Sequence, residues 1–71
     1  MSLTPRQRQI VALVAEGLPN REIAERLGLA RKTVDNQVAA ILVATGARNR
    51  AQIVDLAWRT GILGPVLVGA P

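Results

Sequence analysis

Apolar residues recur three or four positions apart in four short stretches of the chain, which is the spacing of one face of a helix. These stretches predict helices over about residues 5–16, 20–27, 31–45 and 49–60. Each is followed by a glycine, the residue that most easily takes the left-handed conformation of a helix end: Gly17, Gly28, Gly46 and Gly61. No alternating strand pattern appears before Val66. The pattern therefore predicts an all-α fold.

Polar residues at the predicted starts support these boundaries. Thr4 is followed by Pro5 and, three residues on, by Gln7, which together form a capping box at the first helix. We expect Asn20 and Asn49 to be the N-caps of the second and fourth helices, because a short side-chain oxygen can accept a hydrogen bond from the first turn.

The second and third stretches predict a helix-turn-helix. A short helix ends at Gly28 and a longer one opens with two basic residues, Arg31 and Lys32. In a helix-turn-helix the first helix braces the second, which lies in the DNA major groove. The residues expected to form this brace are apolar and helically spaced: Ile23, Ala24 and Leu27 against Val34, Val38, Ile41 and Leu42.

Size and charge narrow the class of protein. The chain has 71 residues, enough for one domain, and nine basic against five acidic residues give a net charge of +4. A basic balance favours an acidic partner such as nucleic acid or an anionic surface. There is no cysteine or histidine, so the common catalytic bases and nucleophiles and an ordinary zinc site are missing. We therefore expect no enzyme activity, no cofactor and no metal.

The expected location is the cytoplasm. The uncharged run from 60 to 71 is short and broken by glycine and proline, whereas a membrane-spanning helix needs about 20 apolar residues. The first residues lack the apolar core of a signal peptide. A role in the membrane is therefore not expected.

Double-stranded DNA is the expected partner, and the third helix supplies most of the candidate contacts. Base-edge reading needs outward hydrogen-bonding groups, and phosphate binding needs basic groups or helix N-termini. Asn36 can pair with adenine and Asp35 can accept from cytosine, with Ala39 beside them, although Asp35 can equally be a plain surface carboxylate. The candidates for phosphate binding are Arg31, Lys32, Thr33, Arg48 and Arg50.

The chain resembles the LuxR-type (GerE-like) helix-turn-helix domain over about residues 3–63, without a gap. The resemblance rests on Thr4-Pro5-Arg6, Ala15-Glu16-Gly17-Leu18, Asn20-x-Glu22-Ile23-Ala24, Leu27-Gly28, Lys32-Thr33-Val34-x-Asn36, Ile41-Leu42, Gly46 and Arg48-Asn49-Arg50-Ala51. It implies a four-helix domain, spanning 1–63, that binds DNA as a dimer through its third helix. It also implies a sequence-specific transcription regulator, often joined to a sensing domain and able to contact RNA polymerase.

Departures from the family pattern put the strength of DNA binding in question. Ala30 replaces the usual Ser or Thr cap, Asp35 a common basic residue and Gln37 a common histidine. Apolar residues replace the usual polar or basic groups further along the helix: Ala39, Ala40, Val43 and Ala44. The alternative is a protein-interaction or adaptor module that keeps the fold but binds DNA weakly or not at all. In that case the third helix presents only a solvated face.

The fourth helix carries more apolar residues than a short helix needs for one core. The resemblance implies that this helix joins two copies, and the candidates for the dimer interface are Ile53, Leu56, Ala57 and Trp58. The apolar tail, 64–71, is either a flexible end or a strap over a partner.

Overall fold

The structure, a computed structural model, describes residues 3–61 and contains four α-helices. They are α1 (Pro5–Ala15), α2 (Asn20–Leu27), α3 (Arg31–Thr45) and α4 (Arg50–Thr60). No strand occurs in this range, so the predicted all-α, four-helix fold is confirmed, with helix ends within one residue of those expected. The tail 64–71 lies outside the described residues, and the domain limits 1–63 stay a prediction.

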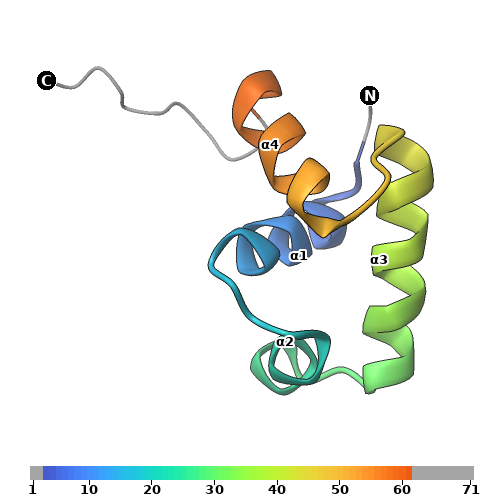
Figure 1. Cartoon of the computed structure of the whole chain (residues 1–71). Coiled ribbons are helices and arrows are strands. Elements are labelled where there is room, and N and C mark those ends of the chain that lie inside the picture. Colours follow the sequence, from blue (N-terminus) through green and yellow to red (C-terminus); the bar gives the residue numbers. More distant parts are fainter. Residues whose placement is uncertain (1–2, 62–71) are drawn as a thin grey trace, which may run out of the picture.

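The long helix α3 runs along one side of the molecule, and the other three helices are stacked beside it (Figure 1). Helix α2 lies at the N-terminal end of α3, α1 at its middle and α4 near its C-terminal end. Helix α3 contacts each of the other three. This arrangement leaves the opposite side of α3 open along its whole length.

One core joins all four helices. Its fully buried side chains come from every element and are all β-branched: Ile10 and Val11 of α1, Ile23 of α2, Val34 and Ile41 of α3, and Ile53 of α4. Burying each such side chain contributes about 1.5–3 kcal/mol. The predicted brace is confirmed, because Ala24 and Val38 belong to this core and Leu27 packs against it. The core thus fixes α3 against α2.

The helix ends follow the local sequence. Thr4 Oγ1 accepts from the Gln7 backbone N–H at 3.1 Å, and Gln7 Oε1 accepts from the Thr4 N–H at 3.0 Å, so the capping box is confirmed. Asn49 caps α4, with Oδ1 2.9 Å from the Gln52 nitrogen. Gly28 ends α2 at a φ of +69°, a conformation that favours glycine.

The prediction that Asn20 caps α2 is wrong. Pro19 is the N-cap residue, with no side-chain hydrogen bond, and Asn20 is the first residue of the helix. The Asn20 amide instead binds Arg50 and Asp35. Both partners are charged, and a hydrogen bond to a charged group is about twice as strong as a neutral one. These stronger bonds explain why the amide turns away from its own helix end.

Candidate nucleic-acid interface

The open side of α3 presents one stripe of exposed residues. It consists of Lys32, Asn36, Ala39 and Val43, whose spacings of four, three and four residues keep them on one face of a helix. The opposite face is buried through Val34, Val38 and Ile41. An α-helix with its side chains is about as wide as the major groove, so a helix supported from one side only can present this stripe to DNA.

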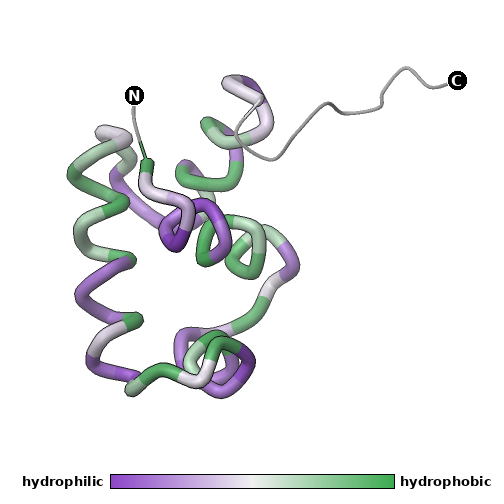
Figure 2. Tube along the Cα trace, turned by 180° about the vertical axis from the view of Figure 1, so that it is seen from behind, coloured by the Kyte–Doolittle hydropathy of each residue, from purple (hydrophilic) through white to green (hydrophobic). Residues whose placement is uncertain are grey.

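The two ends of α3 differ in polarity. Figure 2 shows the half next to α2 mainly in purple, for hydrophilic residues, and the half toward α4 mainly in green. Val43, in the apolar half, is 84% exposed. Polar groups for base edges therefore lie in the N-terminal half, around Lys32 and Asn36, which is the half that a recognition helix directs at bases.

Asp35 lies on the flank of α3 that faces α2, one position away from the exposed stripe. Its Oδ1 accepts a hydrogen bond from Asn20 Nδ2 at 2.9 Å and lies 4.0 Å from Arg31 Nε. The Arg31 side chain is 68% exposed, so it remains accessible to a phosphate. Of this pair, the arginine side chain is the more exposed, and the carboxylate has two partners within the domain.

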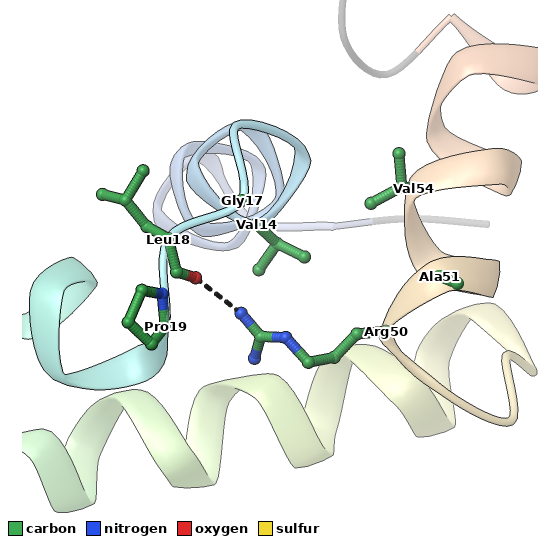
Figure 3. A pocket seen from close by; sticks show the side chains of 7 residues that line it. All are labelled: Val14, Gly17, Leu18, Pro19, Arg50, Ala51 and Val54. Atoms are coloured by element: carbon green, nitrogen blue, oxygen red, sulfur yellow. Dashed lines mark hydrogen bonds between the residues drawn. The ribbon is translucent and has the colours of Figure 1, made fainter.

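Arg50 is held inside the domain by two hydrogen bonds. Nη1 donates to Asn20 Oδ1 at 2.6 Å and Nη2 donates to the Leu18 carbonyl at 2.8 Å. Figure 3 shows the side chain reaching from α4 to the loop that joins α1 and α2. Arg50 is half-buried, whereas Arg48 is exposed. Arg50 thus connects α4 with α2 and with the loop before α2. Arg48 is the more accessible of these two cations.

The start of α3 has no side-chain cap, as the sequence predicted from Ala30. The carbonyl of Ala30 accepts from the N–H groups of Thr33 and Val34, at 3.0 and 3.2 Å. The first N–H groups of a helix have no partner within it and carry partial positive charge. Together with the exposed Arg31, Lys32 and Thr33, they make this end of α3 cationic.

Two of the four candidates for the dimer interface lie in the core, which corrects that assignment. Ile53 is 1% and Ala57 2% exposed, so neither can reach a second molecule. Trp58 is 51% exposed beside Ala12 and Ala15 of α1, where it lines a shallow hollow of about 240 Å³. Leu56 is half-buried on the other flank, near the end of α3. Trp58 is the one exposed candidate.

The interaction that the sequence did not reveal is the one around Asn20. In the sequence, Asn20 is 15 positions from Asp35 and 30 positions from Arg50, so no local spacing connects these residues. The same holds for Gln7 of α1, whose Nε2 donates to Gln37 Oε1 of α3 at 3.2 Å. Only the packing of the helices brings these residues together.

Among the helices of residues 3–61, none has the length and apolarity that a membrane crossing requires. Within the same range, no three acidic, His or Cys side chains gather where they could hold a metal ion.

A four-helix fold with a braced, exposed and basic-ended α3 defines a helix-turn-helix domain. The chain belongs to the luxR family of bacterial regulatory proteins, whose family model matches residues 1–57. The chain is therefore a DNA-binding domain of the kind found in regulators of transcription.

Similar proteins carry names that agree with the family. A putative HTH-type transcriptional regulator of Mycobacterium bovis is 43% identical over 60 residues, which cover 84% of this chain and 7% of the relative. The C4-dicarboxylate transport transcriptional regulatory protein DctR of Rhodobacter capsulatus is 48% identical, over 76% of this chain and 26% of its own. The DNA-binding transcriptional activator DevR/DosR of Mycobacterium tuberculosis is 44% identical, over 70% and 23%. The matched part of this chain thus covers between 7% and 26% of the length of these three relatives.

Proposed function

We propose that this domain reads a specific DNA sequence by placing the N-terminal half of α3 in the major groove. The observation that carries the proposal is the exposed stripe headed by Lys32 and Asn36, directly opposite the fully buried Val34. Because α3 is buried on one side and exposed on the other, it can enter a groove without any rearrangement of the domain's core.

The exposed residues have different roles in DNA binding, according to their chemistry. Arg31, Lys32, Thr33 and Arg48 bind phosphates and set the position on the duplex. Asn36 pairs with an adenine edge through its amide, and Ala39, one turn further on, packs against a thymine methyl group. The partial positive charge at the start of α3 adds backbone N–H contacts to phosphate.

The proposed active form is a dimer, joined on the Trp58 side of α4. Trp58 is exposed, and Ala51 and Val54 line the neighbouring hollow between α4 and the end of α1. Two copies joined in this way place their α3 helices in successive major grooves, with half-sites about one helical turn apart. Because its relatives are named as transcriptional and response regulators, we further propose that the domain works in the cytoplasm together with a sensing domain and RNA polymerase.

Selection from random duplexes tests this function. The chain is mixed with random DNA, bound duplexes are enriched, and the enriched motif is sequenced. A two-fold symmetric motif with half-sites about one turn apart is the expected result. Binding should also weaken as salt rises, with a linear dependence of log K on log salt. No enriched motif and no binding at low salt would refute the proposal.

A protein-interaction module remains the second candidate, because one observation favours it. The C-terminal half of α3 is apolar where DNA contact needs polar groups, and Val43 is 84% exposed. Ala40 and Ala44 are exposed in the same half of α3, and contiguous exposed apolar surface is common where proteins meet. Under this reading a partner covers the apolar half of α3, so V43E weakens partner binding, whereas K32A, in the polar half, leaves it unchanged.

A further inference from the structure

Asn20 stands at the meeting point of three helices. It is the first residue of α2, its Oδ1 accepts from Arg50 Nη1 of α4 at 2.6 Å, and its Nδ2 donates to Asp35 Oδ1 of α3 at 2.9 Å. Arg50 is anchored in turn to the Leu18 carbonyl at 2.8 Å. One amide thus connects the start of α4 with the N-terminal half of α3, using its acceptor for one helix and its donor for the other.

We propose that Asn20 is the positioning residue of the recognition helix and that Asp35 serves this link instead of reading a base. Arg50, Asn20 and Asp35 form a polar chain, here called the Asn20 link, that fixes how the N-terminal half of α3 sits relative to α2 and α4. The inference rests on the proposed DNA-reading function and assigns within it three residues that touch no base.

The place of Asp35 on α3 supports this assignment. Asp35 is one residue before Asn36, and consecutive residues of a helix point about 100° apart. With Asn36 on the open stripe, the Asp35 carboxylate points toward α2, where Asn20 and Arg31 already engage it. A carboxylate aimed at the groove without a donor would instead repel the phosphates on both sides.

The strengths of the bonds also fit a positioning role. Each of the two bonds within the Asn20 link joins a charged group to a neutral side-chain amide. The bond that anchors Arg50 joins its charged guanidinium to the neutral backbone carbonyl of Leu18. Charge-assisted bonds of this kind are short and directional. The link to Asp35 is exposed, so its net contribution to folding is small, but its geometry still selects one placement of α3.

Reversing the polarity of the link is the sharpest test. N20D keeps an acceptor for Arg50 but puts two carboxylates face to face at Asp35. The double variant N20D/D35N restores a donor and an acceptor with the roles exchanged, and D35N alone keeps an acceptor for Asn20. D55N is the matched control, because Asp55 is an exposed carboxylate with an arginine four residues on, Arg59, at 2.7 Å.

The readout is the ratio of affinities for the selected duplex and a scrambled duplex, which cancels general charge effects. Loss of one charge-assisted bond lowers the population of the binding-competent placement, so N20D should reduce the ratio about fivefold or more. N20D/D35N should restore it to within about twofold of the wild type. D55N should leave both the ratio and the enriched motif unchanged. D35N, which keeps an acceptor for Asn20 but loses the charge, should lower the ratio less than N20D does and leave the enriched motif unchanged. Failure of the double variant to restore the ratio, or a changed base preference in D35N, overturns the proposal.

A measurement without DNA separates this inference from the proposed function. The melting temperature should fall in N20D and recover in N20D/D35N, whether or not the domain binds DNA. Recovery of melting temperature without any effect of N20D on the affinity ratio means that Asn20 is only structural, which also overturns the proposal. A wild-type chain that selects no DNA refutes the proposed function instead, while the melting pattern still reports on the link.

Discussion

Lys32 and Asn36 lie one turn apart on the same open stripe, yet their chemistry gives them different tasks. An ammonium on a flexible stem binds any phosphate within reach, whereas a planar amide fits one base edge in one orientation. Both are exposed, so replacing either one leaves the core intact. Their separate effects on affinity and on preference can therefore be measured.

K32A should weaken binding to all duplexes by a similar factor, because a phosphate contact carries no sequence information. The slope of log K against log salt should become shallower by about 0.9, the value for one released counterion. Gel shifts over a salt series measure both effects. R59A is the control, since Arg59 lies at the far end of α4 from the start of α3 (Figure 1) and is paired with Asp55. An unchanged slope in K32A would remove Lys32 from the phosphate contacts.

N36A should act on one base position only. Loss of a bidentate contact to adenine costs about 1–3 kcal/mol of discrimination at that position and little elsewhere. Repeating the selection from random duplexes with the variant gives the comparison. If every position of the motif is kept, Asn36 does not read a base.

At the scale of the helices, the start of α3 lacks the side-chain cap that α1 and α4 have. Helices α1 and α4 each have a side-chain cap, from Thr4 and Asn49, but α3 begins after Ala30 without one. The backbone of Ala30 is already extended, with φ −69° and ψ 144°, which is the conformation that a capping residue takes. A short polar side chain can therefore be added here without moving the backbone.

A30S should stabilise the domain by about 1 kcal/mol by capping α3. For a domain of this size the melting temperature should rise by about 4–8 °C. Circular dichroism during heating measures the change. T4A provides the reverse case, because it removes an existing cap and should cost a similar amount. A melting temperature for A30S at or below that of the wild type would contradict the capping argument.

Helix limits were predictable because they depend on neighbours in the sequence. The capping box at Thr4 and the left-handed glycines act within four or five residues, so local pattern was enough. The role of Asn20 was missed for the opposite reason. An Asn before an apolar repeat normally caps its helix, and only the fold shows that Arg50 and Asp35 compete for the same amide.

At the scale of the whole molecule, assembly depends on which side of α4 stays open. The apolar pattern of α4 predicted an interface but could not divide its residues between the core and a partner. Residues two positions apart on a helix point about 200° apart, so Leu56 and Trp58 cannot lie at the centre of the same contact. The packing on α1 and α3 leaves Trp58 exposed and buries Ile53 and Ala57.

W58E should shift the chain from dimer to monomer, because a carboxylate at the centre of an apolar contact loses its hydration without gaining a partner. Sedimentation equilibrium over a concentration series measures the assembly. V43E is the matched control, since it also removes an exposed apolar side chain, but from α3. Equal dimer fractions in W58E and the wild type would place the interface elsewhere.

The first described residues have a mechanical consequence. Leu3 is 6% exposed, Thr4 is locked in the capping box, and Gln7 of that box donates to Gln37 on α3. Leu3 is thus packed in the core, and two successive hydrogen bonds, Thr4 to Gln7 and Gln7 to Gln37, connect the start of α1 with the recognition helix. We expect a displacement of Leu3 to reach α3 through Gln7 and Gln37, and so to change how the exposed stripe is presented.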